Sequence, residues 1–134
     1  MNNLEKTLVI IKPDAIERNL VGKIISKYED KNLKIKELKI LKASNELLEK
    51  HYAEHKGKSF YNELLNYMKS DLCIVMILEG SNAIESVRNI NGATDPLKAL
   101  TGSIRGDYAF SKTKNLVHAS DSIESAKREI SIWF

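Results

Sequence analysis

The chain has 134 residues, 43% of them hydrophobic, which is enough for one domain with a buried core and excludes a disordered chain. Its net charge of +3 at pH 7 favours an anionic partner but is too small to indicate nucleic acid, and a phosphate-bearing small molecule fits equally well. Because no signal-peptide pattern is present and no apolar run approaches the roughly 18 residues of a membrane span, we expect a cytoplasmic protein without a membrane segment.

Two strands and one helix are expected in the first third of the chain. Residues 7–12 form a short run rich in β-branched side chains that Pro13 stops, and this predicts a buried strand. Apolar residues at helical spacing predict a helix over residues 16–31. Apolar and charged residues then alternate over much of residues 33–41, and this period of two predicts a half-exposed strand.

Two further helices and the most apolar strand are expected in the middle of the chain. Ser44 is a candidate cap of a helix that includes His51, and residues 55–58 interrupt it. Ser59 is a candidate cap of a second helix that runs through Tyr67. Residues 72–79 predict a strand, in which Cys73 is expected to be a buried thiol; it is the only cysteine, so no intrachain disulfide can form.

The last third begins with a helix expected over residues 83–90. Residues 91–106 follow as a loop that is long for a compact domain, and loops of this length are usually functional or disordered. Residues 115–119 predict a short strand, and residues 121–124 resemble a capping box, with its cap near Asp121, that opens a last helix. The predicted buried stripe of that helix is Ile123, Ala126, Ile130 and Trp133.

The order of these elements predicts the fold class. Without the extra helices the order is βαββαβ, the ferredoxin-like split motif of the α+β class. We therefore expect a four-stranded antiparallel sheet with helices packed mainly on one face, plus extra helices and a long loop. No repeat, low-complexity tract or linker divides residues 1–134, so a single domain is expected.

His118 is the first candidate for chemistry, since it ends the last predicted strand directly before the predicted helix cap. Imidazole is nucleophilic near neutral pH, and scattered Lys and Arg suggest phosphoryl chemistry on the ring itself. A histidine at a strand end is nevertheless more often a core or surface residue. Glu129 lies two turns inside the last helix and can either orient the His118 ring or pair with a surface cation, and its spacing favours neither.

Phosphate binding has to rest on side chains, because neither a P-loop nor a dinucleotide-binding glycine motif is present. Lys12, Arg88, Thr94 and Arg105 are the candidates, and the arginines suit phosphate through bidentate hydrogen bonds. Each of them alone is more typical of a solvated surface residue.

Aromatic residues and the other two histidines allow two interpretations each. Phe60 and Tyr52 can belong to the core, or an exposed ring can stack on a base. His51 and His55 are four residues apart, which matches metal spacing on a helix, but only Glu54 lies nearby as a third ligand and Gly57 breaks the segment. We therefore do not expect a zinc site there.

Several stretches together resemble one family. They are TLVIIKPD at residues 7–14, HY at 51–52, NGATDP at 91–96, GSIRGD at 102–107, NLVHASDS at 115–122 and EISIWF at 129–134. With these motifs in this order, the chain resembles nucleoside diphosphate kinases from about Leu4 to Phe134. Ala15 and Ala119 depart from the resemblance, since both positions are commonly glycine in that family.

The resemblance implies a reaction and a role for each matching residue. The expected reaction moves the terminal phosphoryl group of a nucleoside triphosphate to a nucleoside diphosphate in a ping-pong order, through pros-phosphohistidine on His118. Ser120 and Glu129 are expected to support the His118 ring, and Phe60 to stack on the base, which predicts broad base specificity. The residues expected to hold the phosphates and the sugar are Lys12, Tyr52, Arg88, Thr94, Arg105 and Asn115.

The resemblance also implies a cofactor and an assembly. Mg²⁺ is expected to arrive on the phosphates of ATP or another nucleotide, with no cage of protein side chains. A homo-oligomer is expected, either a tetramer or a hexamer, and the chain lacks the tail through which longer members touch their neighbouring subunits.

Two alternatives compete with this interpretation. The first is a ferredoxin-like module that binds nucleotide or RNA without catalysis. Strands 7–12 and 72–79 contain none of the aromatic residues on which such RNA-binding sheets stack bases, which argues against it. The second is a catalytically inactive relative that only assembles, and the presence of His118, Arg88, Arg105, Lys12 and Asn115 argues against that.

Overall fold

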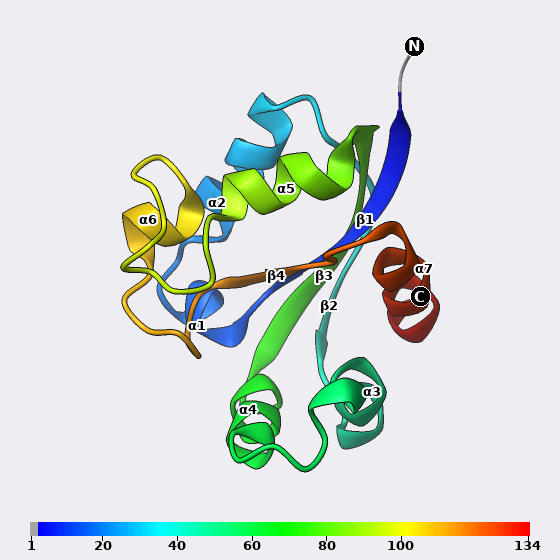
Figure 1. Ribbon diagram of the computed structural model, residues 1–134, viewed down its shortest axis with the longest axis vertical. Coiled ribbons are helices and arrows are strands. Elements are labelled where there is room, and N and C mark those ends of the chain that lie inside the picture. Colours follow the sequence, from blue (N-terminus) through cyan, green and yellow to red (C-terminus); the bar gives the residue numbers. More distant parts are fainter. Residues whose placement is uncertain (1–2) are drawn as a thin grey trace.

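The computed structural model describes residues 3–134, which form one four-stranded antiparallel sheet with helices on both faces (Figure 1). The sheet has the order β2-β3-β1-β4. Its strands are β1 (Leu4–Ile11), β2 (Lys34–Lys42), β3 (Leu72–Ser81) and β4 (Val117–Ala119). The order and the antiparallel pairing confirm the predicted ferredoxin-like sheet.

The two central strands are buried on both faces. Leu8 and Ile10 point to one side of β1, and Val9 and Ile11 point to the other, and all four are fully buried. A continuous apolar run is what a strand covered on both faces needs. The register from Leu4 opposite Ser81 to Ile11 opposite Ile74 aligns the apolar runs of β1 and β3.

The helices divide between the two faces of the sheet. They are α1 (Pro13–Glu17), α2 (Val21–Asp30), α3 (Asn45–His51), the 3-10 helix η1 (Ala53–His55), α4 (Tyr61–Met68), α5 (Ala83–Asn91), α6 (Ile104–Tyr108) and α7 (Ile123–Trp133). Helices α1, α2, α5 and α6 pack on one face, and the additional helices α3, α4 and α7 cover the other. None of the helices in the described residues is both long and apolar enough to cross a membrane.

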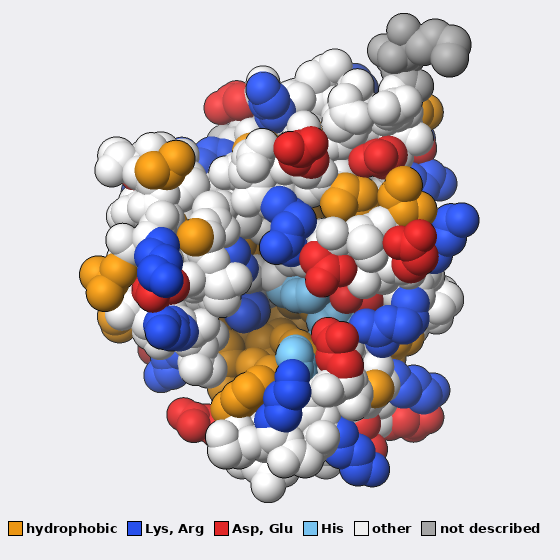
Figure 2. Space-filling model, viewed as in Figure 1, with side chains coloured by type: hydrophobic (Ala, Val, Ile, Leu, Met, Phe, Trp, Pro, Cys, Tyr) orange, Lys and Arg blue, Asp and Glu red, His pale blue; other side chains and the backbone are white. Residues whose placement is uncertain are grey.

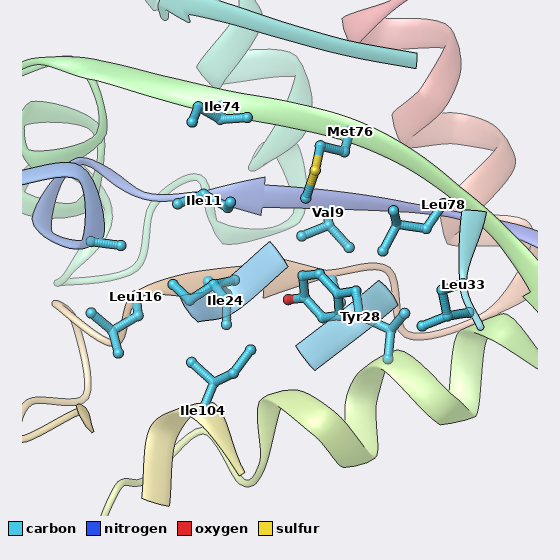
Figure 3. Close-up of a cluster of buried hydrophobic side chains, with 14 of the residues drawn as sticks. Val9, Ile11, Ile24, Tyr28, Leu33, Ile74, Met76, Leu78, Ile104 and Leu116 are labelled. Carbon is cyan, nitrogen blue, oxygen red and sulfur yellow. The ribbon is translucent and has the colours of Figure 1, made fainter. Parts of the chain in front are cut away.

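The first core lies between the sheet and helices α2 and α5. The ring of Tyr28 sits at its centre, below Val9 and Met76 of the sheet and close to Ile24 (Figure 3). The Tyr28 hydroxyl donates a 2.6 Å hydrogen bond to Asn91 Oδ1, so its polar atom is satisfied inside the apolar cluster. This core fixes the end of α5, from which the long loop departs.

The helix expected over residues 16–31 was predicted with the wrong bounds. The structure has two helices here, α1 and α2, separated at residues 18–20. Asn19 adopts a left-handed conformation with φ of 58°, which ends α1. The apolar spacing continues through the break because Leu20 and Ile24 still face the core, so periodicity alone did not locate it.

Two expectations about helix starts and faces were also wrong. Helix α4 begins at Tyr61 after Phe60, with no side-chain cap from Ser59. The start of α7 near Asp121 is confirmed, and its cap is Ser122, which accepts from the amide of Ser125 at 3.0 Å. Ile123 is half exposed and lies outside the buried stripe of α7, since this stripe begins only at Ala126. Ser44 caps α3 as expected, accepting from the amide of Leu47 at 3.1 Å.

The segment expected as a loop over residues 91–106 contains the start of α6. Ser103 caps this helix by accepting from the amide of Gly106 at 3.0 Å. Gly92 and Gly102 have positive φ angles of 86° and 99°, and these bring the chain back toward the sheet. The loop is therefore an ordered strap beside β4, as Figure 1 shows.

Candidate active site

One cavity of about 630 Å³ opens where the long loop, helices α3 to α5 and strand β4 meet. This volume is typical of a small-molecule site. In Figure 2 the histidine side chains gather in the hollow at the centre of the face, with lysine and arginine side chains around it. Nine of the residues predicted for the site line the cavity, and they are Lys12, Tyr52, Phe60, Arg88, Thr94, Arg105, Asn115, His118 and Glu129. Ser120 is fully buried behind them.

His118 stands at the junction of β4 and α7, and the helix holds its ring through Glu129. His118 Nε2 lies 2.9 Å from Glu129 Oε1, and Ser120 Oγ donates to the same oxygen at 2.7 Å. The Glu129 side chain is only 6% exposed, whereas that of His118 is 22% exposed. An ionised carboxylate only accepts, so the ring proton belongs on Nε2, and Nδ1 keeps its lone pair.

His51 lies against His118 and was not predicted to act there. The two ring centroids are 4.5 Å apart in an edge-to-face arrangement. Trp133 Nε1 donates to His51 Nδ1 at 3.0 Å, and an indole N–H can only donate, so the proton of His51 sits on Nε2. Burial, followed by the nearby charge of His118, holds the pKa of His51 well below its usual value, so this ring stays neutral.

His51, His118 and Glu129 also form the one group of metal-ligand types found in residues 3–134, with ligand atoms within 4.8 Å of one another. Two of the three are committed to other partners. The Trp133 bond keeps the proton of His51 on Nε2, and Glu129 already accepts from Ser120 and His118. This pattern is that of a hydrogen-bonded cluster rather than an ion cage. His55 lines the same cavity but is not part of this group, and its Nδ1 lies 3.1 Å from Lys58 Nζ.

Lys12 leaves the end of β1 and reaches the floor of the cavity. Its ammonium donates to Asn115 Oδ1 at 2.7 Å, and the residue is 7% exposed. Burial and the nearby Arg105 lower the pKa of Lys12 to about 7, although Asp14 opposes this shift. A buried cation with one neutral partner is a ready site for an anion.

Arg105 fixes the long loop to β4. Its guanidinium donates to the carbonyl oxygens of Gly92 at 2.8 Å, Asn115 at 3.2 Å and Val117 at 2.5 Å. Burial lowers its pKa to about 10, so the side chain stays charged at neutral pH. Thr94 joins the same arrangement, because its carbonyl accepts from Asn115 Nδ2 at 3.3 Å. Arg105, Asn115 and the loop therefore form one connected wall.

The two ends of the cavity differ in chemistry. The end near α5 and β4 carries the cations, including the exposed Arg88. The other end carries aromatic rings: Phe60 is 45% exposed at the mouth, while Tyr52 is 7% exposed and packs edge-to-face on His51 at 4.5 Å. A cationic end and an aromatic end in one cavity suit a ligand with phosphates and a base.

Carboxylates also line the cavity, from Glu54, Glu63 and Asp121. Hydrogen bonds from Ser125, together with the charge of Arg88, hold the pKa of Asp121 below its usual value, so it stays ionised. Such oxygen atoms are the ligands that Mg²⁺ prefers.

Sequence reasoning missed two supporting pairs. The first is His51 with Trp133, which lie 82 residues apart in the chain. The second is Asp14 with Tyr67: the Tyr67 hydroxyl donates to Asp14 Oδ1 and accepts from the Asp14 amide at 3.2 Å, which ties α4 to α1. Within the described residues Asp14 Oδ2 has no hydrogen-bond partner. Local sequence carries no signal for either contact, since both are long-range.

Comparison with known proteins agrees with this geometry. The family model described as nucleoside diphosphate kinase matches residues 5–134. A nucleoside diphosphate kinase of Thermoanaerobacter sp. (strain X514) is 54% identical over 131 residues, which is 98% of this chain and 97% of that protein. The one of Caldanaerobacter subterraneus subsp. tengcongensis is 56% identical, over 98% of this chain and 94% of that protein.

Solved structures give the same result. The crystal structure of nucleoside diphosphate kinase from Encephalitozoon cuniculi matches with a TM-score of 0.95 and 38% identity, covering 97% of this chain and 88% of that one. The Aquifex aeolicus nucleoside diphosphate kinase matches with a TM-score of 0.94 and 40% identity, covering 98% of this chain and 95% of that one. With this cavity, this fold and relatives matched over nearly their whole length, the chain belongs to the nucleoside diphosphate kinase family.

Proposed function

We propose that this protein transfers the terminal phosphoryl group of a nucleoside triphosphate to a nucleoside diphosphate, and that His118 carries the group between two half-reactions. The observation that carries this proposal is the 2.9 Å contact from His118 Nε2 to Glu129 Oε1. It leaves Nδ1, the pros nitrogen, as the nitrogen with a free lone pair, on a ring that is 22% exposed and lines the cavity.

Each half-reaction balances on one bond made and one bond broken. In the first, the lone pair of His118 Nδ1 bonds to the terminal phosphorus, and the bond from phosphorus to the bridging oxygen breaks, so the electron pair leaves with the diphosphate. In the second, a new diphosphate oxygen takes the phosphoryl group and Nδ1 recovers its lone pair. Glu129 stabilises the positive charge that the ring acquires, because it accepts from the Nε2 proton throughout.

The remaining residues position the nucleotide. Lys12, Arg88 and Arg105 supply positive charge at the phosphate end, where phosphoryl transfer needs it most. Stacking on Phe60 recognises any base by its flat face, which gives broad base specificity. The other residues proposed to hold the phosphates and the sugar are Tyr52, Thr94 and Asn115.

Mg²⁺ is the proposed cofactor. Bound to the nucleotide, it supplies further charge neutralisation on the phosphates. The carboxylates that line the cavity are Glu54, Glu63, Asp121 and Glu129, and the last of these already accepts from His118 and Ser120. We propose that the ion is held mainly by the nucleotide phosphates and not by a dedicated cage of these side chains. The cytoplasmic location and the single domain over residues 1–134 stay predictions.

A homo-oligomer, either a tetramer or a hexamer, is the proposed assembly. Strand β2 supports it, because this strand forms one edge of the sheet and leaves Leu38 and Ile40 exposed by 43% and 58%. An exposed apolar edge strand pairs readily with another strand. A second copy that is centred on Leu38 and runs antiparallel would bring Glu37 opposite Lys39 of the partner, which is an attractive pair.

The test is to mix the purified protein with Mg²⁺ and ATP labelled on the terminal phosphate, without an acceptor. We expect an acid-labile, base-stable phosphoryl group on His118, located by mass spectrometry, and its discharge by the diphosphates of all the common nucleosides. His118→Ala should bind ATP and keep the fold, yet carry no label, because a partly exposed ring that lines the cavity can be removed without opening the core.

Two results would contradict the proposal. Label that persists in His118→Ala would move the phosphoryl group to another residue. If ATP bound but no phosphoprotein formed, the protein would be a nucleotide-binding module that does not catalyse the transfer.

A further inference from the structure

His55 has no part in the mechanism above, yet it lines the cavity beside the ring on which the base is proposed to stack. Its centroid lies 5.4 Å from that of Phe60, with the rings inclined at 62°, and 6.1 Å from that of Tyr52. Tyr52 is buried and fixed by the core, whereas Phe60 is 45% exposed. The imidazole therefore forms the bridge between a fixed ring and a free one.

Both nitrogens of His55 face neighbours in its own segment. Lys58 Nζ lies 3.1 Å from Nδ1, and an ammonium can only donate, so Nδ1 accepts and the ring proton sits on Nε2. Nε2 in turn lies 3.8 Å from Glu54 Oε1. The hydrogen bond from Lys58 fixes the orientation of the ring, and the Glu54 carboxylate lies on its other side, beyond hydrogen-bond distance.

Lys58 also contacts the aromatic end directly. Its ammonium lies 5.8 Å from the centroid of the Phe60 ring, which places a cation near one face of that ring and leaves the rest of it to a ligand. The backbone supports the same turn, because the amide of Lys58 donates to the carbonyl of His55 at 3.0 Å and the amide of Tyr61 to that of Lys58 at 3.1 Å. His55, Lys58 and Phe60 thus form one connected unit.

We propose that His55 is a positioning residue for the base: it holds the Phe60 ring in place before the nucleotide arrives. The inference rests on the proposed function, since it takes Phe60 as the stacking surface. Fixing an exposed side chain in advance removes an entropic cost from binding. It does so equally for every base, because the base touches Phe60 and not His55.

The experiment measures dissociation constants by calorimetry for ADP, CDP and inorganic tripolyphosphate, a ligand without a base. We expect His55→Ala to weaken the binding of ADP and of CDP by the same factor, about three- to tenfold, and to leave the dissociation constant of tripolyphosphate unchanged. In steady-state assays KM should rise by a similar factor while kcat at saturating nucleotide stays the same. His55→Phe, which keeps a ring between Tyr52 and Phe60, should restore most of the affinity.

A double-mutant cycle with Phe60→Ala shows whether His55 acts through that ring. If it does, adding His55→Ala to Phe60→Ala costs nothing further. Lys56→Ala is the matched control, since Lys56 is exposed in the same turn and does not line the cavity, and it should leave all three ligands unaffected.

Three results would overturn the proposal: a loss of tripolyphosphate affinity equal to that of ADP, additive effects of the two substitutions, or a loss confined to one base. These binding measurements need no turnover. If no phosphoprotein formed but the binding constants followed the expected pattern, the phosphoryl transfer would be rejected and the role of His55 would stand.

Discussion

At the residue scale, two neighbouring histidines are given different chemistry by their partners. The Nδ1 atom of His51 accepts from the Trp133 indole, and its ring is buried. His118 makes its contact through Nε2 to Glu129, so its own Nδ1 stays available. Because Nδ1 is occupied in His51 and free in His118, only His118 of these two rings, whose centroids lie 4.5 Å apart, offers a nucleophilic Nδ1.

Lys12 gives a pH-dependence prediction. Its pKa is lowered to about 7, so the ammonium is charged below pH 7 and loses its proton above it in the ligand-free protein. A bound phosphate favours the charged form. The dissociation constant for tripolyphosphate should therefore stay constant between about pH 6 and 7 and rise above pH 7. The rise comes from Lys12, since terminal phosphates with a pKa near 6 are already ionised above pH 7.

The control for this prediction is Lys12→Gln, measured by the same titration calorimetry. It should bind more weakly at every pH and lose the rise above pH 7. If the affinity of the wild-type protein stayed constant up to pH 9, Lys12 would keep its proton over this range, and the binding of tripolyphosphate would not depend on its titration.

At the element scale, the strap formed by residues 91–106 holds the cationic wall in place. Arg105 joins the strap to the carbonyl of Val117 in β4 and to that of Asn115 just before this strand, and it also donates to Gly92 within the strap. Lys27 of α2 donates to the Gly102 carbonyl of the strap at 3.0 Å. The backbone of Leu100 also comes close to α6, so that a methyl group at Gly106 would lie 2.0 Å from the Leu100 carbonyl oxygen. The strap therefore requires glycine at this point.

Gly106→Ala should lower the free energy of unfolding by about 1–3 kcal/mol, because backbone has to move to admit the methyl group. Urea unfolding followed by circular dichroism measures it. Gly22→Ala in α2 is the matched control, since a Cβ there meets nothing within 4 Å, and helical alanine should leave the stability unchanged or raise it slightly. Equal stability of the two variants would mean that the strap is not packed against Leu100.

At the scale of the whole molecule, one edge of the sheet is left open. Strand β4 ends the sheet beside the active site, whereas β2 forms the other edge over Lys34–Lys42 with apolar side chains exposed. None of the residues of β2 lines the cavity. An assembly through β2 would therefore leave each cavity open to nucleotide.

Leu38→Lys should dissociate the proposed homo-oligomer into smaller species, since it puts a charge at the centre of the paired edge. Light scattering after gel filtration measures the mass. Ile123→Lys, which changes a similarly exposed side chain on α7, is the control and should keep the assembly of the wild type. A wild-type monomer, or a Leu38→Lys protein of unchanged mass, would exclude β2 as the interface.

The sequence by itself determined the order of the four strands, most of the helices, the ferredoxin-like class and the membership of the family. These follow from local apolar patterns and from motifs at known spacing, such as the buried run before Pro13 and the motif around His118. It also marked nine cavity residues, because each lies at a strand end, in a helix or in a loop that the motifs identify.

Only the tertiary structure decided which atoms meet. The break at Asn19, the start of α6 inside the long loop and the exposure of Ile123 depend on packing that a single segment does not encode. The contacts of Trp133 with His51 and of Tyr67 with Asp14 join positions 82 and 53 residues apart. A hydrogen bond and a tautomer are set by geometry at the ångström scale, and that geometry exists only once the sheet and both helical layers have packed.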